Sequence, residues 1–193
     1  MKNNVRSAKI RNIAYLAILV ALEVVLNRFC SINTMGLKIG FSFVPIVITA
    51  VLFGPLSAAV VYATADLVGA ILFPIGTYHP GFTVCAAAMG FVYGLFLYVP
   101  RGEEKGVFIR WKKVRVFPNV VLSALINNLV FGLVINTYWV SMLYGSKSYY
   151  GWFIYRLAEY AVLIPVTVIL APAVMRLAGE LSKIIFGKVK NKK

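Results

Sequence analysis

Long apolar runs dominate this chain, and the short segments between them carry most of its charges. Six runs are predicted to form hydrophobic helices, at 12–30, 41–54, 56–74, 82–99, 118–139 and 152–176. A helix needs about 20 apolar residues to cross a hydrocarbon core of about 30 Å, and five of the six runs are close to that length. The pattern therefore predicts an all-α integral membrane protein, built as a six-transmembrane-helix bundle.

The second run differs from the other five. It is short for a bilayer and contains Pro45, and Gly54 with Pro55 then turns the chain sharply into the third run. We therefore predict that the second span is short or kinked. All six spans are expected to pack into a single membrane-embedded domain over residues 1–193.

Composition agrees with a membrane location. Apolar residues make up 61% of the chain and charged residues 13%, against about 45–50% and about 25% in soluble domains. The net charge of +14 does not indicate a nucleic-acid partner, because the basic residues flank apolar spans instead of gathering on a solvated domain. The expected surroundings are the lipid bilayer of the cell membrane.

The distribution of basic residues predicts the orientation of the bundle. Of the 20 lysines and arginines, four precede the first span, six lie in 100–117 and six follow from Arg176 onward, so 16 fall on one side of a six-span topology. Cytoplasmic loops carry the excess of lysine and arginine. Both termini are therefore expected on the cytoplasmic side.

Four basic residues remain for the outer side, and three of them lie in or beside spans: Arg28, Lys38 and Arg156. Ionisable groups in spans usually face a bundle interior or a cavity, which makes each one a candidate for ligand binding. The alternatives are that they extend to the membrane interface or pair with acids, and Glu159, three residues after Arg156, lies on the same helix face.

Further polar and aromatic side chains gather on the same side. Asp66 lies within the third span, where an ionised carboxylate needs a donor. The loop before the fourth span offers Tyr78, His79 and Phe82, and Trp139 ends the fifth span. An aromatic belt at the membrane interface is the competing interpretation of the rings. The positive excess among these groups suits an anionic ligand.

The sequence offers little for catalysis or metal binding. His79 is the only histidine, the stretch 145–148 lacks the spacing of a phosphate-binding loop, and Cys30 and Cys85 form no CxxC motif. We predict no catalytic residue, no metal and no cofactor, and expect both cysteines to pack as small buried hydrophobic residues. A membrane enzyme with His79 or Asp66 as base, and an assembly subunit that binds no solute, stay open as alternatives.

Small residues spaced four apart occur on three helices. They are Ala17 with Ala21, Ala59 with Ala63, and Gly90 with Gly94. Such spacing lets helices approach closely. Packing inside the bundle and docking onto another membrane protein both explain it.

Several short strings, taken in order, resemble the substrate-binding S components of energy-coupling factor (ECF) vitamin transporters, particularly the folate-specific branch. The strings are 26–29, 37–45, 52–55, 65–69, 73–76, 78–83, 136–139 and 143–145, with Arg156. The resemblance implies a vitamin-binding pocket that faces outward. It also implies a transmembrane coupling protein and two cytoplasmic ATPase subunits as partners, with Ala17 and Ala21 as the face that contacts the coupling protein.

The resemblance and the outer polar groups together define a candidate site. Its residues are Arg28, Lys38, Asp66, Tyr78, His79, Phe82, Asn136, Trp139 and Arg156. For folate, the flat pterin is expected to stack on Trp139 or on the loop with Tyr78 and Phe82, and the glutamate carboxylates to meet one or more of the three basic residues. An S component for a different vitamin or an anionic precursor is the alternative.

Overall fold

The computed structural model describes residues 2–34, 37–98, 116–145 and 147–187. Its helices are α1 (Lys2–Arg28), α2 (Phe43–Phe53), α3 (Pro55–Leu72), α4 (Pro80–Leu97), α6 (Val116–Leu125), the π-helix η1 (Ile126–Ile135), α7 (Asn136–Tyr144) and α8 (Tyr149–Gly187). Five helical segments are long and apolar enough to span a membrane, because α6, η1 and α7 run on as one. With α2 as the sixth helix, the predicted six-helix membrane bundle is confirmed.

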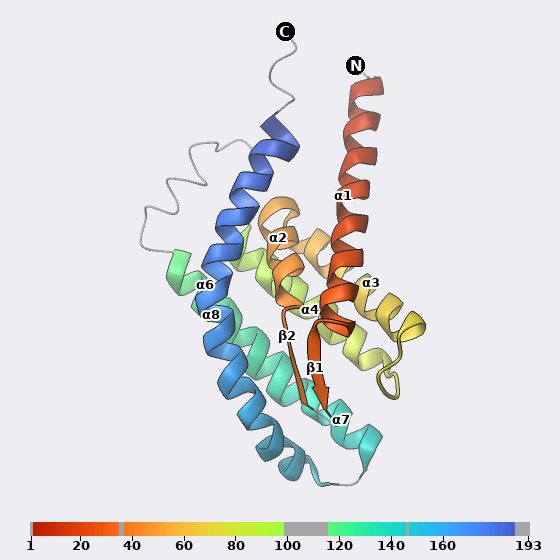
Figure 1. The fold of residues 1–193 in the computed structure, drawn as a ribbon, viewed down its shortest axis with the longest axis vertical. Coiled ribbons are helices and arrows are strands. Elements are labelled where there is room, and N and C mark those ends of the chain that lie inside the picture. The colour runs from red at the N-terminus through yellow and green to blue at the C-terminus, as the bar shows by residue number, and fades with distance from the viewer. Residues whose placement is uncertain (1, 35–36, 99–115, 146, 188–193) are drawn as a thin grey trace.

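The first turn of α1 and the last turn of α8 lie at the same end of the molecule (Figure 1). The basic segment predicted at 100–117 falls almost entirely outside the described residues, and so does the chain beyond 187.

Helix α2 explains why the second span looked unusual in the sequence. With 11 residues it is too short to cross a bilayer. Pro45 lies in its first turn, where a missing N–H costs little, so this proline does not kink the helix. The second span is therefore short and not kinked. The helix ends at Gly54, whose φ of 86° favours glycine, and Pro55 opens α3 directly.

The surroundings of α2 form the core of the molecule. Ile46, Val47 and Ala50 are completely buried, and neighbouring turns bury Ile48, Val51 and Leu52 as well. A helix that is apolar on all sides belongs in the interior of a bundle. Helices α1, α3, α4 and α8 pack against it.

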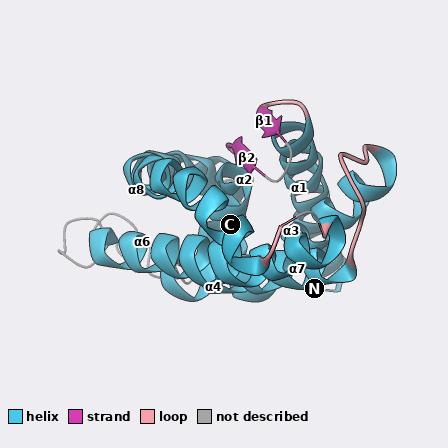
Figure 2. Ribbon diagram, turned by 90° about the horizontal axis from the view of Figure 1, so that it is seen from below, coloured by secondary structure: helices cyan, strands magenta, loops and turns pink. Residues whose placement is uncertain are grey.

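A two-stranded antiparallel hairpin follows α1, and the sequence did not indicate it. Strand β1 (Ser31–Thr34) pairs with β2 (Leu37–Gly40), with Ser31 opposite Gly40. The hairpin lies on the side of the bundle formed by α8 and α1, and α4 and α6 lie on the opposite side (Figure 2). Its backbone groups pair with each other, which allows non-helical chain to lie beside membrane helices.

The three small-residue pairs differ in their surroundings, and Ala59 and Ala63 of α3 are half-buried. Gly90 and Gly94 face the backbone of α3 at Ala58 and Pro55, where an added Cβ would collide, so this pair serves packing inside the bundle. Ala17 and Ala21 are exposed on α1. The face of α1 that carries them is therefore free for an external contact.

The prediction for the cysteines was right for one residue only. Cys85 is buried in α4, but Cys30 is exposed. The reason is its position after the last turn of α1, where the chain leaves the helix and turns toward β1. Both thiols are free.

Candidate solute-binding cavity

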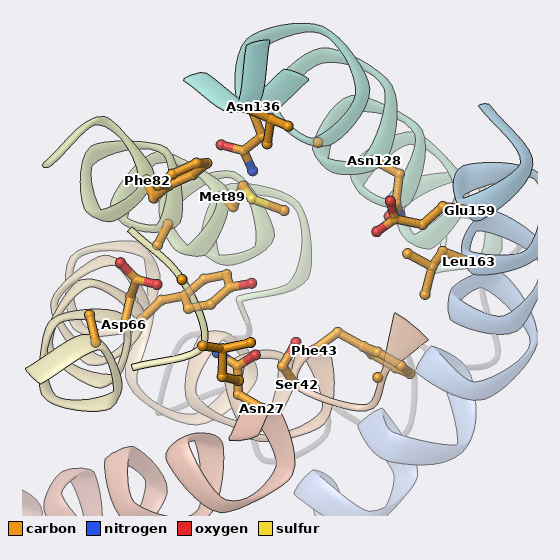
Figure 3. Close-up of a pocket in the computed structure, with 18 of the residues that line it drawn as sticks. Asn27, Ser42, Phe43, Asp66, Phe82, Met89, Asn128, Asn136, Glu159 and Leu163 are labelled. Carbon is orange, nitrogen blue, oxygen red and sulfur yellow. The ribbon is translucent and has the colours of Figure 1, made fainter. Parts of the chain in front are cut away.

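The described residues line a cavity of about 660 Å³, whose wall is formed by residues of α1, α2, α3, α4, η1, α7 and α8, of strand β2 and of the loop after α3. Figure 3 shows Asp66 of α3, Phe82 and Met89 of α4, and Asn136 of α7 around the cavity. Asn27 of α1 and Ser42, the residue before α2, face it from the opposite wall. Six of the nine predicted site residues line it: Arg28, Asp66, Tyr78, Phe82, Asn136 and Arg156. Helical spans distant in the sequence therefore bring these groups to one space.

The other three predicted residues are placed differently. His79 and Trp139 do not line the cavity but stack on each other, with ring centroids 4.6 Å apart. His79 caps α4, because its Nδ1 accepts a hydrogen bond from the Gly81 N–H at 3.0 Å. The backbone of Lys38 lies in β2, opposite Asn33, and its side chain lies outside the described part of the chain.

The α1 wall of the cavity holds Asn27 and Arg28. The Asn27 amide donates a hydrogen bond of 2.9 Å to Glu23, one turn earlier and completely buried. The Arg28 guanidinium lies directly against Gly69 of α3, where any side chain would displace it. Its Nε is buried without a hydrogen-bond partner, and Arg28 forms no ion pair with another described residue.

The α3 and α4 walls carry a chain of hydroxyl groups that ends at a carboxylate. Thr83 Oγ1 donates to Asp66 Oδ2 at 2.7 Å. The Tyr78 hydroxyl lies 3.0 Å from the same Thr83 oxygen. Because the single Thr83 proton goes to Asp66, Tyr78 must donate to Thr83. The donor that Asp66 was expected to need is therefore Thr83, and the chain ties the loop before α4 to the cavity wall.

The α8 wall presents Arg156, which is 6% exposed. Its Nε donates to Glu159 at 3.2 Å, one terminal nitrogen donates to Thr137 at 3.2 Å, and the other donates to Tyr160 at 2.8 Å. The ion pair with Glu159 that the sequence offered as an alternative is therefore present, and both partners line the cavity.

The fifth span lines the cavity through an unusual helix. In η1 the chain follows the wider turn of a π-helix, with i→i+5 hydrogen bonds. Five lining residues are spaced four apart along η1 and α7: Asn128, Gly132, Asn136, Val140 and Tyr144. In an α-helix this spacing drifts around the axis, and the wider π-turn reduces that drift. Gly132 leaves room for the Tyr160 ring, and Asn136 Oδ1 is buried without a partner.

Sequence reasoning missed several lining residues, including Asn27, Asn128 and Glu159. The available signal was polar residues spaced three or four apart within apolar helices, which places Glu23 with Asn27 and Arg156 with Glu159 on shared faces. The π-helix itself leaves no comparable signal.

The cavity is equipped to bind a polar solute. Arg28 offers a cation without an acidic partner among the described residues, Asp66 offers an acceptor, and tyrosine and phenylalanine rings form flat walls. No group of three potential metal ligands occurs among the described residues. A bundle of apolar spans around such a cavity defines a solute-binding membrane protein.

Comparison with known proteins identifies the family. Residues 7–178 match the family model described as ECF-type riboflavin transporter, S component. The chain therefore belongs to the S components of ECF-type transporters, a family of transporter subunits and not of enzymes. The multi-pass membrane location predicted from the apolar runs agrees with this membership.

Relatives within this family carry the name of a different vitamin. The folate transporter FolT of Clostridium novyi (strain NT) is 35% identical over 173 residues, which are 90% of this chain and 92% of that protein. The folate transporter FolT of Leuconostoc mesenteroides subsp. mesenteroides is 27% identical, over 82% of this chain and 80% of that protein.

A solved structure, the crystal structure of FolT bound with folic acid, matches with a TM-score of 0.73 and 32% identity. The matched region covers 86% of this chain and 93% of the FolT chain. The resemblance to ECF S components noted in the sequence is thereby confirmed.

Proposed function

We propose that this protein is a folate-binding S component, which captures the vitamin from outside the cell for ATP-driven uptake by partner subunits. The observation that carries the proposal is the match, over most of both chains, to FolT bound with folic acid. The named relatives support the same vitamin. The charges on the cavity wall suit it on chemical grounds.

Folate combines a flat pterin ring that donates N–H groups with a glutamate that carries two carboxylates. The Asp66 carboxylate is a suitable acceptor for pterin N–H groups, and Phe82 and Tyr78 are suitable stacking partners. Arg28 is the preferred partner for a ligand carboxylate, because its charge has no acidic partner among the described residues. Asn136 and Arg156 complete the proposed site, and Lys38 stays a candidate for a second carboxylate contact.

His79 and Trp139 take a supporting role in this proposal. Their stacked rings lie behind the start of α4, where Gly81 packs closely against Trp139. They hold the loop that carries Tyr78 and the first turn that carries Phe82. A direct ligand contact is not needed from either residue.

Riboflavin is the second candidate, because the matching family model is described by that vitamin. Riboflavin has no carboxylate and is neutral at pH 7. An arginine without an acidic partner inside a membrane protein favours an anionic ligand over a neutral one. The charge of Arg28 therefore supports folate, or another anionic vitamin or precursor, over riboflavin.

Uptake needs an energy source, and the sequence shows no phosphate-binding loop that would let this chain hydrolyse ATP itself. We infer that a transmembrane coupling protein and two cytoplasmic ATPase subunits drive it, as membership of the ECF family implies. The exposed pair Ala17 and Ala21 is the proposed contact with the coupling protein. The distribution of basic residues supports both termini on the cytoplasmic side, with the whole chain as one domain.

The test is a calorimetric titration of the detergent-purified protein with folic acid, riboflavin, thiamin and biotin. We expect saturable binding of folic acid, tighter than that of the other three vitamins by at least about 100-fold, or about 2.7 kcal/mol. Folic acid binding no tighter than riboflavin binding would overturn the assignment.

A further inference from the structure

The two arginines of the cavity are in different electrostatic states. Arg156 has an acidic partner at 3.2 Å, and the side chains of Arg156 and Glu159 are 7% and 2% exposed. Arg28 lies in the same cavity and forms no ion pair with any described residue. Of these two arginines, only Arg28 therefore presents a charge that no described acidic residue compensates.

Neighbouring residues hold the Arg156–Glu159 pair in place. The hydroxyl groups of Thr137 in α7 and Tyr160 in α8 accept hydrogen bonds from the two terminal nitrogens of Arg156. Gly132 of η1 provides the space for the Tyr160 ring. The guanidinium has five N–H donors, and three are used in these bonds. Two N–H groups are left, so Arg156 is still able to donate hydrogen bonds to a ligand although its charge is balanced.

A balanced arginine and an unbalanced one suit different parts of a ligand. Charges in a water-poor site interact strongly because the effective dielectric constant is low. A carboxylate placed at Arg156 would meet the Glu159 carboxylate as well, and the repulsion would offset much of the attraction. An uncharged acceptor, such as a ring or amide carbonyl, would gain the hydrogen bonds without that repulsion.

We propose that Glu159 is a specificity-determining residue, which neutralises Arg156 so that the α8 wall takes an uncharged part of the ligand and the anionic end goes to Arg28. This inference rests on the proposed function, since it assigns the two ends of folate to two walls. Glu159 acts through Arg156 and is a positioning residue, not a contact for the carboxylates.

The experiment compares folic acid with its α,γ-diamide, in which carboxamides replace both glutamate carboxylates. The ratio of the two affinities, measured by calorimetry on the full-length protein in detergent, reports how strongly the site attracts the carboxylates. The variants are Glu159→Gln, Arg28→Gln and the double variant Arg156→Gln/Glu159→Gln. Thermal unfolding of each ligand-free variant is measured first.

Wild-type protein is expected to prefer folic acid over the diamide, and Arg28→Gln to bring the ratio close to one. In Glu159→Gln, Arg156 becomes uncompensated, so the ratio rises by at least about tenfold. In the double variant both charges are gone, and the ratio returns to the wild-type value. A role of Glu159 in folding alone would lower both affinities together and leave the ratio unchanged.

Two results would overturn the inference. One is an unchanged ratio in Glu159→Gln, and the other is a double variant whose ratio falls as it does in Arg28→Gln, which would make Arg156 the carboxylate partner. If Glu159→Gln does not fold, the double variant decides alone, since a wild-type ratio supports the inference. Failure of the proposed function looks different, because wild-type protein would then not bind folic acid in the same titration.

Discussion

The two halves of the bundle, divided by the first turn of α2, are built in opposite ways. In one half, the short helix α2 is surrounded on all sides, and Ile46, Val47 and Ala50 are completely buried. In the other half, a hairpin and a polar cavity occupy the space that a full-length second span would fill. The comparison teaches that a shortened helix makes room for a ligand without weakening the core on which the other helices pack.

The largest effect is expected from the exposed face of α1, which serves neither the core nor the cavity. Ala17→Trp is expected to abolish folate uptake in cells that hold the coupling subunits, because the bulky ring prevents close helix approach. Calorimetric folic acid binding by the purified variant should stay at the wild-type level. Ala161→Trp, at an exposed alanine of α8, is the matched control. Uptake and binding falling together would show that the Ala17 face packs inside the protein.

In the packed half, Ile46→Ala is expected to destabilise the protein by about 2–5 kcal/mol, because it leaves a cavity beside a completely buried side chain. Denaturant unfolding of purified protein measures this, and the fraction that remains folded should bind folic acid normally. Ile169→Ala removes the same atoms from a side chain that is 72% exposed on α8, and it should change stability little. Equal losses in the two variants would contradict the division into a packed and a hollow half.

In the hollow half, a substitution should change folic acid affinity more than it changes the free energy of unfolding. Arg28→Gln is expected to weaken folic acid binding by about 1.5–3 kcal/mol, the usual value of a hydrogen bond to a charged group, or about 10- to 150-fold. The unfolding free energy should hardly change, because Arg28 forms no ion pair with a described residue. Arg6→Gln, at an exposed position of α1, controls for net charge. A large loss of stability with unchanged affinity would place Arg28 among the structural residues.

The smallest effect is expected at the hydroxyl chain above the cavity. Tyr78→Phe removes the donor to Thr83 but leaves the Thr83 bond to Asp66. A neutral hydrogen bond contributes about 0.5–1.5 kcal/mol, so folic acid affinity should fall by about 2- to 13-fold. Stopped-flow fluorescence should show faster dissociation of the vitamin, because the loop that carries Tyr78 is less firmly tied. Unchanged dissociation would mean that this tether does not hold the ligand.

The helical architecture was readable from the sequence, because apolar runs of spanning length are a strong signal. The short second span was readable too, from its length and from Gly54 with Pro55. The hairpin was not, since its pairing of Ser31 with Gly40 depends on space that α2 leaves open. The π-helix also escaped prediction, because nothing in the composition of 126–135 distinguishes its wider turn from an ordinary membrane helix.

The candidate site was predictable in part, because a charge within a span usually faces the interior. That rule found Arg28, Asp66 and Arg156, which all line the cavity. The sequence does not show which side of a helix faces the cavity. It therefore could not separate Phe82, which lines the cavity, from Trp139, which stacks on His79. It left the pairing of Arg156 with Glu159 open as an alternative, and it could not show that Arg28 has no such partner among the described residues.

The most direct test of the central claim is an experimental structure of the protein with folic acid bound. The vitamin is expected in the cavity between Arg28, Asp66 and Asn136, with a glutamate carboxylate within hydrogen-bond distance of the Arg28 guanidinium. Density for the vitamin outside this cavity, or a carboxylate bound at Arg156 with Glu159 displaced, would contradict the account.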